Sequence, residues 1–216
     1  EKEITSKTRM IILNSPSNPS GVNYNKNELT ALSEVLLKYP DTLIVTDDIY
    51  EHIFWGSEKF VNIINVCAEL YDRTIVVNGV SKAYSMTGWR VGYAAGPEKI
   101  IKEMKKIQSQ STSNPNSIAQ AAAVAALEGK QDFIRGCVNT FKERHDFLIN
   151  ELKEISDINV LASEGTFYSF PDMNNLIKKF GKISNDIELA EFFLDKAEVA
   201  MVPGSAFGVP GCMRIS

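Results

Sequence analysis

The first half of the chain alternates short apolar runs with amphipathic stretches of helical period. The apolar, β-branched runs predict strands at 9–14, 42–47, 74–78 and 91–95. The amphipathic stretches predict helices at 26–38, with Asn25 or Asn27 as its cap, and at 98–109. The continuously apolar run at 42–47 is typical of a strand buried on both faces. This order predicts an α/β sheet with mostly parallel strands.

The pattern changes at about residue 114. The sequence predicts helices at 117–129, 132–155 and 186–197, and shorter strands at 158–161, 166–170, 199–203 and 212–216. Strands and helices no longer alternate strictly, which favours a separate α+β unit. The predicted fold class is therefore α/β: part of a large domain at 1–131 and a smaller α+β domain at 132–216, joined by the long helix 132–155.

Composition excludes several classes of function. The 216 residues are 44% hydrophobic and 23% charged, as in an ordinary globular protein, and the net charge of -4 offers no basic face for nucleic acid. We expect no membrane partner, because no apolar run approaches the length of a span. Cys67, Cys137 and Cys212 have no C-x-x-C spacing, and His52 and His145 are the only histidines, so neither a disulfide framework nor a metal site is predicted. These features favour a reducing, cytoplasmic setting.

Both ends suggest a piece of a longer protein. Glu1 is not an initiator methionine, and "CMRIS" (212–216) ends inside a predicted strand. We therefore expect residues before and after this chain in the intact protein.

Four stretches place polar residues at predicted strand ends, where α/β sheets bind ligands. They are "NSPSNPSG" (14–21), "VTDDIYEHIF" (45–54), "VSKAYSMTGWRVGYAAGP" (80–97) and "VPGSAFGVPGCMRIS" (202–216). Taken singly, each also fits a structural interpretation: a proline-rich turn, an Asp47 or Asp48 that caps a turn, or a polar surface hairpin. Asp47 is costly to bury unless it meets a cation or a strong donor.

Taken together, the stretches suit one ligand. A phosphorylated aromatic aldehyde with a pyridine nitrogen, such as pyridoxal 5'-phosphate, uses a lysine for a Schiff base and an aspartate at the ring nitrogen. A tyrosine and an asparagine can hold its phenolic oxygen, and an arginine its phosphate. A second arginine is then available to bind a substrate carboxylate through two parallel hydrogen bonds.

With these residues in place, the chain resembles the class I/II aminotransferases, pyridoxal-phosphate enzymes of fold type I. It looks most like the bacterial-type aspartate aminotransferase branch. The resemblance covers essentially the whole chain, in the family's order. Its motifs are "NSPSNPSG", "TDDIYEH", "NGVSKAYSMTGWRVGYAAGP", "SQSTSNPNSIAQ", "EGTFYSF", "VPGSAFG" and "MRIS". The Lys82-to-Arg90 block, with Asp47 and Tyr50 upstream, is the most specific part.

The resemblance implies a role for each cofactor-binding residue. Lys82 matches the Schiff-base lysine, which also shuttles the proton once the substrate displaces it. Asp47 matches the carboxylate that keeps the pyridine nitrogen protonated. Tyr50 and Asn18 match the groups that bond the phenolic oxygen, and Asn18 is also a candidate contact of the substrate carboxylate.

The two arginines divide phosphate and substrate between them. Arg90 matches the phosphate-binding arginine, and Arg214 the one that binds the substrate α-carboxylate. The chain departs from the family three residues before the lysine, where Gly79 replaces a serine that often contacts the phosphate. The resemblance leaves open whether Ser81 substitutes for it.

The implied function is transfer of an amino group between an amino acid, aspartate, and a 2-oxo acid, 2-oxoglutarate, by a homodimer. Two alternatives remain: a pyridoxal-phosphate-dependent lyase on the same scaffold, and the cofactor-sensing domain of a transcription regulator. The family's glycine-rich phosphate loop, its ring-stacking aromatic residue and its side-chain selector lie before the matching region, and the last helix lies after it. We therefore expect the 216-residue piece alone to be inactive.

The remaining candidates are interpreted as structural. His52 follows a strand end and has no counterpart in the motifs. His145 lies among charged residues of the predicted helix 132–155 and is expected to face solvent. The three cysteines are expected to be small core residues.

Overall fold

A computed structural model describes residues 2–216. By internal contacts the chain divides into two compact units, residues 2–16 with 24–136 and residues 17–23 with 137–216. The loop 17–23 belongs to the second unit, although the sequence analysis placed it in the first domain. The assignment of 1–131 and 132–216 to a large and a small domain stays a prediction.

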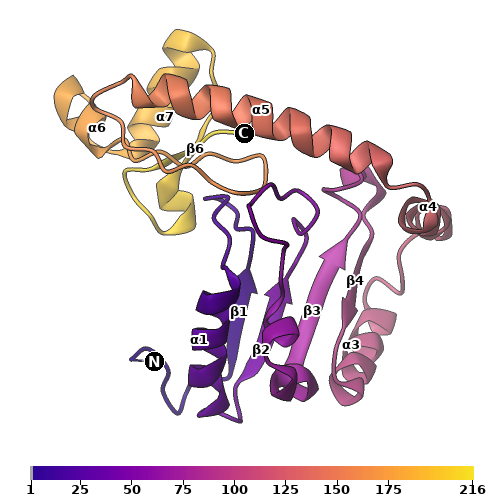
Figure 1. Cartoon of the computed structure of the whole chain (residues 1–216). Coiled ribbons are helices and arrows are strands. Elements are labelled where there is room, and N and C mark those ends of the chain that lie inside the picture. Colours follow the sequence, from indigo (N-terminus) through magenta and orange to yellow (C-terminus); the bar gives the residue numbers. More distant parts are fainter. Residues whose placement is uncertain (1) are drawn as a thin grey trace. The chain divides into compact units, whose positions relative to one another are not determined.

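The first unit contains a four-stranded sheet. Its strands are β1 (Met10–Asn14), β2 (Leu43–Asp47), β3 (Thr74–Gly79) and β4 (Gly92–Ala95), in the order β1-β2-β3-β4 (Figure 1). The first three strands are parallel and β4 is antiparallel, which confirms the predicted, mostly parallel sheet. The register pairs Asn14 with Asp47 and Asp47 with Val77. The carboxyl ends of the parallel strands therefore share one edge.

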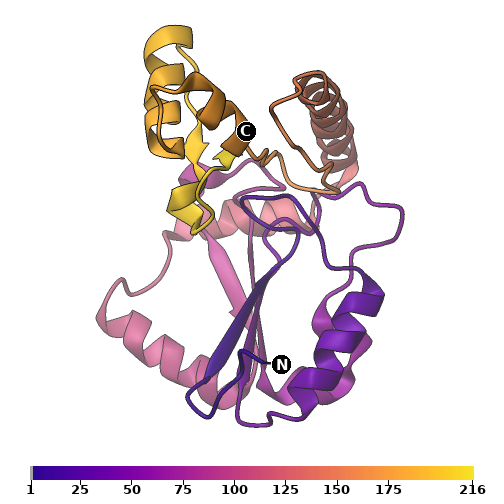
Figure 2. The same ribbon diagram turned by 90° about the vertical axis from the view of Figure 1, so that its left-hand side faces the viewer.

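Helices lie on both faces of this sheet. They are α1 (Lys26–Leu37), α2 (Ile63–Val66), the 3-10 helix η1 (Ala68–Arg73), α3 (Glu98–Gln110) and α4 (Ser117–Glu128). Asn25 begins α1 with a capping box shared with Glu28, as the sequence predicts. Figure 2 shows α1 and α3 on opposite faces. The core lies between α1, α2 and the sheet, and consists of Leu13, Leu29, Leu36, Ile44, Ile63, Cys67 and Leu70.

Burial of the central strands is unequal on the two faces. Ile44 and Thr46 of β2 are buried, whereas the alternate residues are half-buried, and Ile12 of β1 is 67% exposed. The expectation that 42–47 is buried on both faces therefore holds fully for one face only.

The second unit is built around the C-terminal part of α5 (Asp132–Lys153). It also contains α6 (Asn174–Phe180), α7 (Asp186–Ala197), the 3-10 helix η3 (Gly204–Phe207) and the antiparallel strands β5 (Val202–Pro203) and β6 (Met213–Arg214). Its core consists of Leu152, Ile158, Met173, Ile177, Leu189 and Met213. The strands predicted at 158–161 and 166–170 are absent from the described chain as regular strands, because those segments form only isolated bridges, such as Ser169 with Ile215.

Two predictions about single residues are wrong. His145 is 7% exposed and does not face solvent. Residues 145, 149 and 152 form one buried stripe at helical spacing on α5, so the charged neighbours of His145 in sequence lie on other faces of the helix. Cys137 is exposed rather than in a core, while Cys67 is buried and Cys212 is half-buried.

Across residues 2–216, no helix combines the length and apolarity that a membrane crossing requires.

Candidate active site

Lys82 and Tyr50 come together at the carboxyl edge of the first unit's sheet. Lys82 follows β3 in the loop that leads through the 3-10 helix η2 (Thr87–Trp89) to β4, and Tyr50 follows β2. The Lys82 ammonium lies 5.9 Å from the centroid of the Tyr50 ring. Tyr50 is buried and Lys82 is half-buried. The turn is closed by the Ser85 amide, which donates to the Lys82 carbonyl at 3.1 Å.

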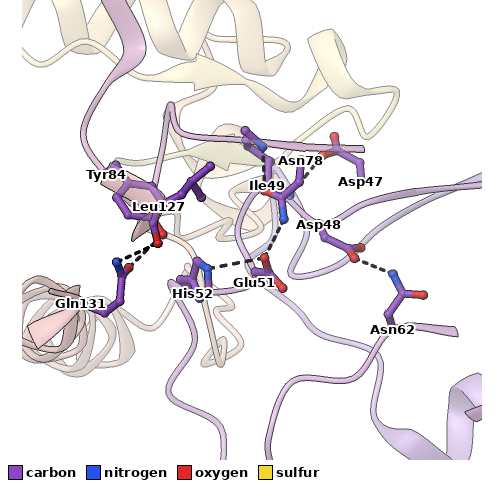
Figure 3. Close-up of polar contacts among 11 residues, drawn as sticks. Asp47, Asp48, Ile49, Glu51, His52, Asn62, Asn78, Tyr84, Leu127 and Gln131 are labelled. Atoms are coloured by element: carbon purple, nitrogen blue, oxygen red, sulfur yellow. Dashed lines mark hydrogen bonds and ion pairs between the residues drawn. The ribbon is translucent and has the colours of Figure 1, made fainter. Parts of the chain in front are cut away.

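The two neighbouring aspartates have different environments (Figure 3). Asp47, the last residue of β2, is half-buried and accepts a hydrogen bond from the Ile49 amide at 3.3 Å. Asp48 is buried and accepts from Thr46 Oγ1 and Asn62 Nδ2, which ties the end of β2 to the cap of α2. Burial raises the pKa of Asp48 in spite of these bonds. Asp48 is therefore held within the protein, whereas the half-buried Asp47 keeps part of its surface exposed.

A polar chain that the sequence analysis missed supports the Lys82 turn (Figure 3). Asn78 Nδ2 donates to Glu51 Oε1 at 2.6 Å, and His52 Nε2 lies 3.5 Å from the same oxygen. The His52 ring meets Tyr84 edge-on, and the Tyr84 hydroxyl donates to Gln131 Oε1 at 2.9 Å. Burial, and then the charge of Glu51, raise the pKa of Tyr84, so it stays a donor. These contacts hold Tyr84, two positions after Lys82, in place.

Arg90 lies in the same loop in an unusual backbone conformation. Its φ of 56° is in the left-handed region, which costs a non-glycine residue on the order of 1 kcal/mol and is concentrated at functional sites. The guanidinium is exposed and donates to the Thr87 carbonyl at 2.9 Å. Arg90 and Ser85 line a hollow of about 700 Å³ on this unit, large enough for a small ligand.

The departure at Gly79 has a packing cause. A Cβ at this position would lie 2.9 Å from the Val91 carbonyl oxygen of the neighbouring chain segment. A serine therefore does not fit here without movement of the backbone. Ser81, whose role the resemblance leaves open, is half-buried on the same turn, one residue before Lys82.

Arg214 and Asn18 come together in the second unit. Arg214 Nη1 donates to Asn18 Oδ1 at 2.9 Å. The guanidinium carbon lies 4.5 Å from the centroid of the Tyr168 ring and 5.1 Å from that of Phe207. Arg214 Nε is buried and has no hydrogen-bond partner among the described residues. We call these four residues the Arg214 clamp; in it the guanidinium lies against two aromatic rings, as planar guanidinium groups commonly do.

The sequence analysis predicted Asn18 and Arg214 but missed the two rings. Tyr168 and Phe207 lie within "EGTFYSF" and "VPGSAFG", stretches that carried the resemblance without an assigned role. The available signal was the presence of aromatic residues in motifs of the same resemblance as the predicted substrate arginine, since planar guanidinium groups stack on aromatic faces.

Comparison with known proteins decides the family. Residues 1–216 match the family described as aminotransferase class I and II. The chain belongs to this family. The aspartate/prephenate aminotransferase of Nitrosomonas europaea is 56% identical over all of this chain and 56% of its own length. The aspartate aminotransferase of Rhizobium meliloti strain 1021 is 46% identical over all of this chain and 54% of its own length.

A solved aminotransferase has the same fold. The crystal structure of the aspartate aminotransferase from Rhizobium meliloti superposes with a TM-score of 0.93 at 46% identity, over 99% of this chain and 54% of that protein. This likeness confirms the predicted fold class. The chain spans little more than half the length of these relatives.

The polar side chains of this class I/II chain fit pyridoxal phosphate, the cofactor of the family. On the first unit they comprise an amine for its aldehyde (Lys82), a carboxylate for its ring nitrogen (Asp47), a phenol for its ring oxygen (Tyr50) and a guanidinium for its phosphate (Arg90). Each group has the charge or polarity that its partner atom requires. These roles, and those of Ser81, Asn18 and Arg214, stay predictions.

Proposed function

We propose that the full-length protein is a pyridoxal-phosphate-dependent aminotransferase that moves an amino group between aspartate and 2-oxoglutarate. The observation that carries the proposal is the convergence of Lys82 and Tyr50 at the strand edge where Asp47 also ends. Further support comes from the relatives described above, named as aspartate or aspartate/prephenate aminotransferases.

In this proposal the first unit binds the cofactor and moves the proton. Bound pyridoxal phosphate supplies an electron-accepting ring for the electron pair released when the substrate loses its α-proton. Lys82 would hold the cofactor through Nζ, and the same Nζ would serve as the base that takes up the substrate α-proton. The Asp47 carboxylate holds a proton on the ring nitrogen, and Arg90 neutralises the phosphate.

The second unit orients the substrate. Arg214 binds the α-carboxylate through its fork of N–H donors. Asn18 Oδ1 accepts from Arg214, so its contribution to the phenolic oxygen comes from Nδ2.

The assembly and setting belong to the same proposal. We infer a homodimer in a reducing, cytoplasmic compartment, supported by the resemblance and by the free thiols of Cys67, Cys137 and Cys212. Sedimentation of the full-length protein at micromolar concentration tests the dimer.

The test of the activity is Lys82→Ala in the full-length protein. Transfer from aspartate to 2-oxoglutarate is followed by reduction of the oxaloacetate formed, with Lys105→Ala, at an exposed lysine of α3, as the control. We expect the transfer rate of the Lys82 variant to fall by about 10²- to 10⁴-fold and the rate of the control to stay unchanged. A Lys82 variant that retains the rate contradicts the proposal. Release of ammonia without amino transfer by the wild-type protein would instead identify a lyase.

A further inference from the structure

His145 is a buried titratable side chain that the proposed reaction does not use. It is 7% exposed on α5, and its ring contacts two serines of the second unit. The Ser163 amide donates to Nε2 at 3.1 Å, and the Ser169 hydroxyl lies 3.4 Å from Nδ1. Because Nε2 accepts, the neutral ring carries its proton on Nδ1, which donates to Ser169 Oγ.

The Ser163 contact leads to Asn18. A Cβ at Gly21 would lie 2.6 Å from Ser163 Oγ and 2.7 Å from the Gly165 carbonyl oxygen, so the loop that carries Asn18 rests directly on this segment. That loop is closed by two short backbone bonds, from the Gly21 amide to the Ser17 carbonyl at 2.7 Å and from the Ser17 amide to the Val22 carbonyl at 2.9 Å. The position of Ser163 therefore sets the position of Asn18.

The Ser169 contact leads to Arg214. Ser169 and Ile215 exchange two backbone hydrogen bonds, each of 2.9 Å, and Ile215 follows Arg214 directly. On the other side, Ser169 follows Tyr168, the ring that lies 4.5 Å from the Arg214 guanidinium carbon. The position of Ser169 therefore sets both the backbone of Arg214 and one of the rings that hold its side chain.

We propose that His145 is a positioning residue for the substrate carboxylate, holding the Asn18 side and the Arg214 side of the clamp in register through one imidazole ring. The inference rests on the proposed function, since it deepens the substrate role of Arg214. It requires a neutral ring, because a proton on Nε2 would face the Ser163 N–H. Burial lowers the pKa of His145, Asp146 opposes this shift and Lys142 acts in the same direction as burial; Arg144 lines a cavity together with His145.

Three substitutions in the full-length protein separate the two contacts. His145→Leu removes both. His145→Gln keeps an acceptor near the place of Nε2 for the Ser163 amide, and His145→Asn keeps a donor near the place of Nδ1 for Ser169. Glu143→Leu, at an exposed position of α5, is the control.

The measurements are kcat and KM for aspartate, and calorimetric binding of succinate, a dicarboxylate that cannot react. We expect His145→Leu to raise the KM and the succinate Kd about tenfold with kcat changed less than about threefold, because the clamp is displaced while the Lys82 chemistry is untouched. Glutamine should restore affinity more than asparagine, since the Ser163 bond is the shorter of the two and satisfies a buried backbone donor.

Unchanged KM and succinate affinity in all three variants would overturn the inference, as would a loss confined to kcat. If His145→Leu does not fold, the proposal is tested by the other two variants. It predicts that His145→Gln binds succinate more tightly than His145→Asn, and equal affinities refute it. A wild-type protein without transaminase activity would refute the proposed function instead, and succinate calorimetry would still test His145.

Discussion

Replacing Arg214 by methionine distinguishes an arginine kept for a ligand from one kept for the fold. Methionine retains the unbranched part of the side chain up to about the place of Nε, but it removes the guanidinium that lies against Tyr168 and Phe207. The folded chain then loses the bond to Asn18 at 2.9 Å and the stacking at 4.5 and 5.1 Å. The substitution also removes Arg214 Nε, a buried donor with no hydrogen-bond partner among the described residues, and its removal stabilises the folded chain.

These contributions to the free energy of unfolding nearly cancel. The bond to the exposed Asn18 contributes about 1 kcal/mol, and the two ring contacts about 1–2 kcal/mol together. Removing a buried donor without a partner returns about 1–3 kcal/mol. We therefore expect the free energy of unfolding to change by less than about 2 kcal/mol. Substrate binding loses two charge-assisted bonds, about 3–4 kcal/mol in total, which is roughly a 100- to 1,000-fold rise in KM.

The assay pairs urea unfolding with the KM for aspartate in the full-length protein. Arg214→Lys is expected to lie between methionine and wild type, because it keeps the charge but not the fork of donors. Arg144→Met, at an exposed arginine of the same unit, controls for loss of a positive charge. A fall of more than about 3 kcal/mol in the free energy of unfolding with an unchanged KM would refute the reasoning and make Arg214 a structural residue.

Two further predictions concern stability. Arg73 donates to three backbone carbonyls at the end of α1 and in the following turn, at 2.7, 2.8 and 2.9 Å, so Arg73→Met should lower the free energy of unfolding by about 2–4 kcal/mol in urea, whereas the exposed Arg135→Met should not. The pKa of His145 is lowered in the folded chain, so just below pH 6.5 only the unfolded chain takes up a proton at this residue. The stability that the neutral ring provides is therefore complete above pH 6.5 and is lost as the pH falls through the folded pKa. Urea unfolding at about pH 7.5 and about pH 5 should show a smaller acid loss for His145→Gln than for wild type, and equal losses would contradict the assignment.

Local signals in the sequence determined most of the regular structure. The four strands of the first sheet, the capping box of Asn25 with Glu28 and the long helix α5 each depend on neighbours within a few positions. Hydrogen bonds within a helix and the alternation of a strand have fixed short periods, so apolar spacing exposes them directly. The Lys82-to-Arg90 block was readable for the same reason, since one loop holds both cations.

Weak or competing local signals misled the prediction. The sequence analysis did not predict helix α6, which has only seven residues and whose N-cap, Met173, makes no side-chain capping bond, although Asp172 accepts from the Asn174 amide at 2.8 Å. The segments 158–161 and 166–170 have strand-like composition, but bridge pairing depends on a distant partner, and they form only isolated bridges. His145 appeared polar because of its neighbours in sequence, although the helical stripe it shares with residues 149 and 152 is buried.

Only the tertiary structure decided how the Arg214 clamp is built. Asn18 and Arg214 are 196 positions apart, and their hydrogen bond follows from the packing of the second unit rather than from any local pattern. The same packing brings the guanidinium against the Tyr168 ring and leaves Nε without a hydrogen-bond partner within residues 2–216. The sequence by itself therefore determined which residue types the site contains, because chemistry selects them. Their geometry required the fold, because long-range contacts form only when distant segments pack together.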